Sequence, residues 1–259
     1  MSKLNKLKSI LKNYPGVIAA LSGGVDSSLL LQLAKDVLND RVVAVTAISP
    51  LHPKDEVDAA RKVARKLKCR HIIVQSWELK NPQFTRNPRN RCYFCKRNLF
   101  KNLQEIASRY GFVVIEGSNT SDLLDYRPGL RALQELGIKS PFIMAGFDKH
   151  EIRLLAKKLQ LENWNKPATA CLASRIPYGT PIDEKILRRI RLAERYVKNL
   201  TVTQVRVRDH YPIARIEVQM TDFQKVLKNR TRTVRYFRRL GYKFISLDLE
   251  GYQIGSLNR

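Results

Sequence analysis

The first half of the chain alternates between apolar runs and amphipathic patterns. Four runs are apolar over most of their length and predict β-strands: residues 16–21, 41–49, 70–75 and 112–117. Helical spacing separates them at Val25–Leu38, Lys54–Leu67 and Cys95–Tyr110, and two more helices are expected at 130–136 and 149–159. Apolar strands that alternate with helices predict an α/β fold, with a parallel sheet covered by helices on both faces.

The pattern changes in the second half. Residues 163–181 contain three prolines and show no clean period, so they are expected to form a linker or active-site loop. A helix at 183–198, strands at 202–208 and 213–219, a basic helix at 222–239 and a strand at 243–249 follow. We therefore expect three parts: a nucleotide-binding domain over 1–162, a cysteine-bearing linker over 163–181 and a small α+β domain over 182–259.

The stretch LSGGVDSSLLL, residues 21–31, joins the first strand to the first long helix. Two glycines allow positive φ and a close approach by a ligand, and the helix that follows presents unpaired N–H groups. Asp26, Ser27 and Ser28 lie in its first turn. This predicts an anion site at the carboxyl end of a strand, where open α/β sheets bind ligands. The spacing fits neither a Walker A loop nor G-x-G-x-x-G.

The net charge of +25 raises the expectation of an anionic partner, either a polyanion such as RNA or a small anionic substrate. A general bias toward basic residues explains it equally well. No apolar run is long enough to cross a bilayer, and the basic N-terminal stretch lacks the apolar core of a signal peptide. We expect a cytoplasmic protein with no membrane partner.

Four cysteines are too few for a disulfide framework and fit metal binding or catalysis better. Cys92 and Cys95 form a C-x-x-C pair, which is compatible with half a zinc site, a redox pair or part of a cluster. A second C-x-x-C for a zinc ribbon is missing. Together with Cys171 the pair would suit a [4Fe–4S] cluster with one open iron position. Cys69 is expected to be a buried structural thiol.

SGGVDSS resembles the PP-loop of the N-type ATP pyrophosphatases, which include GMP synthetase and NAD synthetase. The resemblance implies that a substrate oxygen is adenylated with release of pyrophosphate. It assigns the grip on the pyrophosphate of ATP to Ser22, Gly23, Gly24, Asp26, Ser27 and Ser28. Asp26 would also help to hold Mg²⁺, and Ala47, at the end of the second strand, would lie against the adenine.

Four further motifs narrow the resemblance: NRCYFCK, EGSNTSDLLDYRPG, PATACLASRIPYG and VRVRDHYPIARIEV. Together they resemble the LarE-type sulfur transferases, which act in assembling the nickel-pincer nucleotide of lactate racemase. That family converts a carboxylate of pyridinium-3,5-biscarboxylic acid mononucleotide into a thiocarboxylate. One branch sacrifices the sulfur of the cysteine at position 171. The other holds a [4Fe–4S] cluster on three cysteines, and the presence of Cys92, Cys95 and Cys171 assigns this chain to it.

The same resemblance implies further site residues. Gly117, Asn119 and Asp122, with Glu116, Ser118 and Asp125, would line the nucleotide and magnesium site. Ser174 and Arg175 would act beside Cys171 in catalysis. Arg206 and Arg208, on one face of a strand, would bind the substrate phosphate. His210 and Glu217 match motif positions without an assigned step. The family also implies a homo-oligomer, a hexamer.

Two other functions stay open at the level of sequence. Some tRNA thiolases combine a PP-loop with a three-cysteine [4Fe–4S] cluster, and the +25 charge favours a tRNA partner. A GMP-synthetase relative would need a glutaminase or another ammonia source, and the chain has no obvious glutaminase nucleophile. The donor of the sulfide is not identified by any motif.

Overall fold

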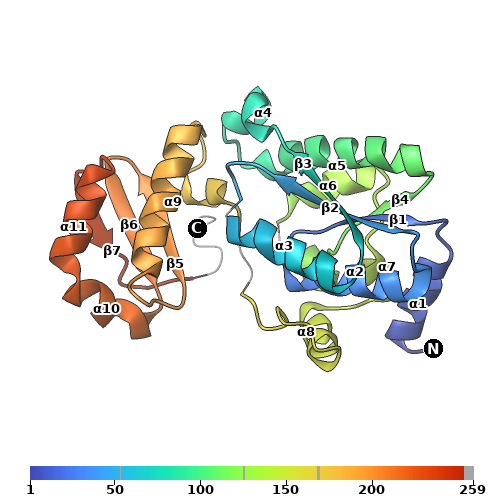
Figure 1. The fold of residues 1–259 in the computed structure, drawn as a ribbon. Helices are drawn as coiled ribbons and strands as arrows, with labels where there is room; N and C mark the ends of the chain where they lie inside the picture. The colour runs from blue at the N-terminus through green and yellow to red at the C-terminus, as the bar shows by residue number, and fades with distance from the viewer. Residues whose placement is uncertain (53, 125, 168–169, 254–259) are drawn as a thin grey trace. The chain divides into compact units, whose positions relative to one another are not determined.

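The computed structural model of the chain describes residues 1–52, 54–124, 126–167 and 170–253. It divides into two compact units (Figure 1). The first comprises Met1–Glu78 and Asn90–Thr169, and the second comprises Leu79–Arg89 and Ala170–Arg259. The division falls inside the expected linker. Residues 79–89, which the sequence pattern places in the first domain, belong to the second unit.

Asn87 explains why residues 79–89 join the second unit. Its side chain is fully buried and donates to the carbonyl oxygens of Pro177 (2.8 Å) and Thr180 (2.9 Å). Its own carbonyl accepts from Gly179 N, and Thr85 O accepts from Ile182 N. A buried carboxamide has to be hydrogen-bonded, so these bonds fasten the segment to residues almost a hundred positions later in the chain.

The first unit contains a four-stranded parallel sheet in the order β3-β2-β1-β4. Its strands are β1 (Val17–Ala20), β2 (Val42–Ile48), β3 (Arg70–Gln75) and β4 (Val113–Ile115). Val17 stands opposite Val42 on one side and Val113 on the other, and every pairing is parallel. The α/β fold expected from the alternating pattern is therefore confirmed.

Helices cover both faces of this sheet (Figure 1). They are α1 (Lys3–Lys12), α2 (Val25–Leu38), α3 (Lys54–Lys66), α5 (Arg91–Tyr110), α6 (Pro128–Glu135), α7 (Pro141–Ala145) and α8 (Lys149–Lys158). The strands alternate between two cores: Val17 and Ala19 join the one formed with α1, α2 and α8, whereas Ile18 joins the one formed with α5 and α6. Buried contacts on both faces explain why the strands are apolar throughout.

The second unit has a three-stranded mixed sheet in the order β5-β6-β7. β5 (Val205–His210) and β6 (Ile213–Val218) are antiparallel, and β7 (Phe244–Leu247) runs parallel to β6. Its helices are the short α4 (Pro82–Thr85), α9 (Glu184–Lys198), α10 (Phe223–Lys228) and α11 (Arg230–Arg239). The core includes Val207, Ile216, Phe237 and Tyr242. Within the described residues, no helix is long and apolar enough to cross a membrane.

Two helices differ from their expected bounds. α5 begins at Arg91 rather than Cys95, so both cysteines of the C-x-x-C pair lie on it. The basic helix expected at 222–239 is two helices, interrupted at Asn229. There the Asn229 side chain donates to Lys225 O (2.8 Å). Asn favours such local bonds to the backbone, which compete with a continuous helix.

Asp222 provides a test of the second unit's stability. Its buried carboxylate accepts hydrogen bonds from Lys225 Nζ, Thr203 N and Thr203 Oγ1, at 2.7–2.8 Å. The bond from Lys225 is the largest cause that lowers its pKa to about 2. A depressed pKa contributes stability that is present above the ordinary value and is lost as the pH falls toward 2.

We expect Asp222→Asn to lower the free energy of unfolding by about 1–2 kcal/mol at pH 7. The difference from the unchanged protein should shrink between about pH 4 and pH 2, because the carboxylate becomes protonated there. Urea unfolding across this pH range measures it. If the difference in the free energy of unfolding did not change with pH, the charge of Asp222 would contribute nothing to stability.

Candidate functional site

The loop between β1 and α2 is built around a backbone that only glycine permits. Gly23 has φ +77°, and a Cβ there would lie 2.6 Å from Glu56 O and 3.0 Å from Ala60 N of α3. Gly24 is the N-cap of α2 and supplies no side-chain cap. The first amides of α2 are therefore left for a ligand at the positive end of the helix dipole.

Serine hydroxyls hold the loop in shape. Ser22 N donates to Ser27 Oγ (3.2 Å), the two serine oxygens lie 3.1 Å apart, and Ser27 Oγ donates to Gly24 O (3.2 Å). These bonds close the turn upon itself at the end of β1. This geometry suits an anion cradle, and anion binding by SGGVDSS stays a prediction.

A second loop, which follows β4, packs against the phosphate loop. At Gly117, just beyond β4, a Cβ would lie 3.0 Å from Ser27 N and 3.1 Å from the carbonyl carbon of Asp26. Any larger residue would push against the first turn of α2. Asn119 is 1% exposed and caps the next turn, where its Oδ1 accepts from Ser121 N (3.1 Å) and its own N–H donates to Asp122 Oδ2 (3.0 Å). Asp125 lies outside the described residues.

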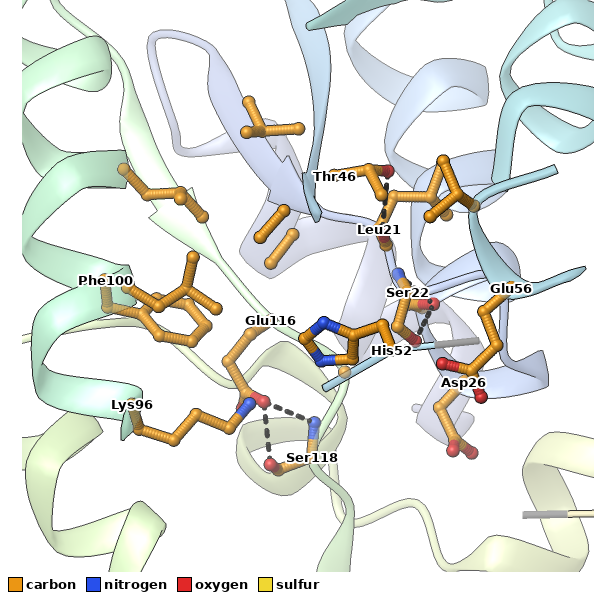
Figure 2. A pocket seen from close by; sticks show the side chains of 18 of the residues that line it. Leu21, Ser22, Asp26, Thr46, His52, Glu56, Lys96, Phe100, Glu116 and Ser118 are labelled. Atoms are coloured by element: carbon orange, nitrogen blue, oxygen red, sulfur yellow. Dashed lines mark hydrogen bonds between the residues drawn. The ribbon is translucent and has the colours of Figure 1, made fainter. Parts of the chain in front are cut away.

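A pocket of about 380 Å³ opens beside the cradle. Of the predicted ATP-binding residues, six line it: Ser22, Asp26, Ser27, Ala47, Gly117 and Asp122. Lys96 and Phe100 of α5 face the loop across it (Figure 2). Lys96 and Arg127 also line it; they lie within the NRCYFCK and EGSNTSDLLDYRPG motifs, although neither was assigned to the nucleotide site. His52 and Glu56 line it as well and lie outside the motifs, in the loop after β2 and on α3, where the pattern shows only amphipathicity. Burial lowers the pKa of His52.

Asp26 carries the features of a magnesium ligand. Its Oδ2 accepts from the ammonium of Lys149, the first residue of α8. Its Oδ1 is buried and has no hydrogen-bond partner among the described residues. A buried carboxylate oxygen without a partner costs free energy, and Mg²⁺ bound through one or two carboxylates and phosphate oxygens would satisfy it. Lys149 adds a positive charge at this point that the sequence patterns did not reveal.

Ser28 lies on the other side of the loop from this pocket. It is fully buried, and its Oγ accepts from Asn163 Nδ2 (2.9 Å), which also donates to Gly23 O (3.1 Å). Both residues line a second cavity, of about 630 Å³, between α2, α3 and residues 159–166. Asn163 thus braces the loop from behind, from the start of the segment that leads to Cys171.

The cysteines are divided between the two units. Cys92 is exposed and Cys95 half-buried on the first turns of α5, and their spacing of three places them on one face. Cys95 Sγ lies 4.0 Å from Glu78 Oε1. Cys171 is half-buried in the second unit. Within the described residues, no three His, Cys, Asp or Glu side chains are grouped to hold a metal ion. The convergence of the three thiols stays a prediction.

Cys69 is buried, as expected for a structural thiol. Its sulfur lies 3.5 Å from Val42 O, and burial raises the pKa of the thiol. A thiol held in its neutral form by burial is a poor nucleophile and a poor metal ligand.

The turn that carries Cys171 is tied down by a buried arginine. Arg175, 1% exposed, forms a two-point ion pair with Glu194 (2.8 and 3.2 Å) and donates to Cys171 O (3.0 Å). Ser174 Oγ also donates to Cys171 O (2.9 Å). Both predicted catalytic neighbours therefore hold the backbone of Cys171 in place.

Two more arginines reach this turn from β5. Arg208 pairs with the fully buried Glu217 (2.8 Å) and donates to Ser174 O (2.7 Å). Arg206 is 8% exposed and has no ion pair within the described residues. Burial, followed by the charge of Arg175, lowers the pKa of Arg206. Its Nη1 donates to Val205 O (2.8 Å), and the guanidinium lies 5.2 Å from the centre of the Tyr252 ring. Binding of the substrate phosphate at Arg206 stays a prediction.

Glu194 was not anticipated, because nothing in the helical pattern of α9 distinguishes it from its other charged residues. It is half-buried, pairs with Arg175 and accepts from Val207 N (3.0 Å). His210 is half-buried on β5, and its Nε2 has no hydrogen-bond partner among the described residues. Burial is the largest cause that lowers its pKa.

Comparison with known proteins places this geometry in a family. The Asparagine synthase family profile matches residues 11–85, which include the phosphate loop. The uncharacterized protein slr1717 of Synechocystis sp. is 42% identical over 100% of this chain and 97% of its own length. GMP synthase of Aeropyrum pernix is 27% identical over 70% of this chain, but only 39% of that protein is covered.

The pyridinium-3,5-bisthiocarboxylic acid mononucleotide synthase of Lactiplantibacillus plantarum is 36% identical over 99% of this chain and 94% of its own length. This similarity extends through both units and includes the segment around Cys171. The chain therefore belongs to the family of that synthase, the LarE-type ATP-dependent sulfur transferases of the PP-loop superfamily.

Proposed function

We propose that the chain uses ATP to activate a carboxylate of pyridinium-3,5-biscarboxylic acid mononucleotide and replaces one of its oxygens with sulfur. The product is the thiocarboxylate required for the nickel-pincer nucleotide of lactate racemase. One observation carries the proposal: the similarity to the bisthiocarboxylate synthase covers almost the whole length of both chains. The loop that all PP-loop proteins share would not distinguish the substrate.

In the activation step, the substrate carboxylate attacks the α-phosphorus of ATP. The bond between the α-phosphorus and the bridging oxygen breaks, and pyrophosphate leaves. The open amides at the start of α2 bind its charge. Asp26 would hold Mg²⁺ through Oδ1, and Lys149 provides a further cation beside it. AMP is now joined to the substrate carboxyl, and AMP is a good leaving group for the next step.

In the second step, a sulfur nucleophile attacks the activated carbonyl carbon. A C–S bond forms, the C–O bond to AMP breaks, and AMP takes up the electron pair. Arg206 has the burial and the unpaired charge expected of a group that binds the substrate phosphate, with Arg208 on the same face of β5. Ser174 and Arg175 fix the backbone at Cys171, so that its thiol is held in one position.

The sulfur source is proposed to be a [4Fe–4S] cluster held by Cys92, Cys95 and Cys171. Thiolates are the ligands that such clusters use, and two of the three lie on one exposed face of α5. A bound cluster would supply sulfide as the nucleophile. The family's other route, in which Cys171 gives up its own sulfur, does not need Cys92 or Cys95. Assembly into a homo-oligomer, a hexamer, is proposed on the family resemblance alone.

A second candidate is thiolation of tRNA. It is favoured by one observation, the formal net charge of +25.

The two candidate functions differ in the molecule that accepts the sulfur, so they can be distinguished by the acceptor on which pyrophosphate release depends. With ATP and Mg²⁺, we expect pyrophosphate release to depend on the pyridinium biscarboxylate mononucleotide, and mass spectrometry of the product should show replacement of one oxygen by sulfur. Unmodified tRNA is the comparison acceptor. Pyrophosphate release that depends on tRNA and not on the mononucleotide would reverse the assignment.

Asn163 should determine how well the loop is held for ATP. Asn163→Ala removes two hydrogen bonds to Gly23 and Ser28, and we expect the KM for ATP to rise about tenfold with little change in kcat. Asn163→Gln should recover part of the loss. Asn165→Ala, an exposed position lining the same cavity, is the matched control. If Asn163→Ala and Asn165→Ala raised the KM for ATP equally, the hydrogen bonds of Asn163 would not be what holds the loop.

Substitutions of the cysteines should distinguish the activation step from the sulfur-transfer step. Cys171→Ala should release pyrophosphate at close to the normal rate but form no thiocarboxylate.

Protein purified without oxygen should be brown and contain about four iron atoms per chain. Replacing Cys92, Cys95 or Cys171 with Ala should each remove this iron, whereas Cys69→Ala should retain it. A colourless zinc protein, or multiple turnovers by Cys171→Ala, would contradict the cluster.

A further inference from the structure

The outer side of α11 is a surface that the proposed function does not use. Four arginines with Thr231 and Val234 line an open hollow along it; they are Arg230, Arg235, Arg238 and Arg239. All four arginine side chains are exposed. We call this surface the α11 arginine face. It belongs wholly to the second unit (Figure 1).

The surrounding sequence offers nothing to neutralise this charge. Residues 223–247 contain five arginines and three lysines and no aspartate or glutamate. Within the described residues, no arginine of α11 takes part in an ion pair. Arg189 and Arg208 of the same unit, in contrast, pair with Asp209 and Glu217. The charge of α11 is therefore available to a partner.

The opposite side of α11 is held firmly. Thr233 and Phe237 are buried, and Tyr236 stacks on Tyr196 of α9 with ring centroids 4.4 Å apart. Thr233 Oγ1 also donates to Asn229 O (3.0 Å). The arginines thus project from a helix that is anchored along its length, so binding a partner does not require the helix itself to become ordered.

The composition of the α11 arginine face favours phosphate over protein. Interfaces between proteins are centred on aromatic and apolar anchors, and the only apolar residue here is the half-buried Val234. Arginine binds phosphate through two parallel hydrogen bonds. From Arg230 to Arg239 the helix rises about 13 Å, long enough to pass several backbone phosphates of a duplex; in B-form DNA these follow one another about every 3.4 Å along the axis of each strand.

We propose that the α11 arginine face binds the phosphate backbone of double-stranded RNA, independently of base sequence. A helix that reads DNA protrudes into the major groove and carries side chains that recognise bases. α11 exposes only one side, and that side carries no Asn, Gln or acidic residue. Duplex RNA is recognised mainly by its shape and its phosphates, which a shallow basic face can contact. The site shares no residue with the proposed sulfur-transfer site.

The test measures binding of the full chain to a labelled 20-base-pair RNA duplex by fluorescence anisotropy at several salt concentrations. The combined variant Arg235→Gln, Arg238→Gln and Arg239→Gln should weaken binding at least tenfold. It should also reduce the slope of log affinity against log salt by about 2–3. Replacing the same arginines with Lys should retain most of the salt slope but lose part of the affinity.

The matched control removes the same charge elsewhere. Lys6, Lys8 and Lys12 are exposed on α1 and have no ion pair among the described residues, and their change to Gln should leave RNA binding close to normal. Equal weakening by both triple variants, or no RNA binding by the unchanged chain, would overturn the proposal. So would equal affinity for duplex DNA, or equal competition by polyglutamate, which would indicate an acidic protein partner. Pyrophosphate release with the pyridinium mononucleotide as acceptor should be unchanged in the α11 variants.

Discussion

The first turn of α2 is the constraint around which the first unit is organised. The cap of the helix is a glycine without a side chain, which leaves the first amides open, and the turn is closed by Ser22 and Ser27 instead. Two other backbones approach this turn so closely that Gly23 and Gly117 have no room for a Cβ. The result is a rigid, positively polarised cradle at the carboxyl edge of a parallel sheet.

In the second unit, positively charged side chains are buried and some of them form ion pairs. Arg175, Arg206 and Arg208 are all nearly inaccessible to solvent; within the described residues Arg175 pairs with Glu194, Arg208 pairs with Glu217 and Arg206 forms no ion pair. Burying a guanidinium is costly unless it is paired, so the unpaired Arg206 is held at a cost that an anionic ligand would offset. Bonds from Arg175 and Ser174 also fix the backbone of Cys171, and Arg208 joins this network through Ser174 O.

Asn163 contacts the phosphate loop and lies close to Cys171 in the sequence. It holds the phosphate loop through Gly23 and Ser28, and Cys171 follows eight positions later in the chain. A segment of that length can extend about 27 Å at most.

The sequence by itself determined the α/β fold, the bounds of α2 and β3, and the phosphate loop, because periodicity and glycine spacing act over a few neighbouring residues. That Cys92 shares a helix face with Cys95 became clear only from the structure, because the predicted helix began at Cys95 whereas α5 begins at Arg91. Only the tertiary structure decided that Ser28 faces Asn163, that Lys149 contacts Asp26 and that residues 79–89 join the second unit. Each of these pairings joins residues about 90 or more positions apart, and no local pattern encodes which distant partner satisfies a buried polar group.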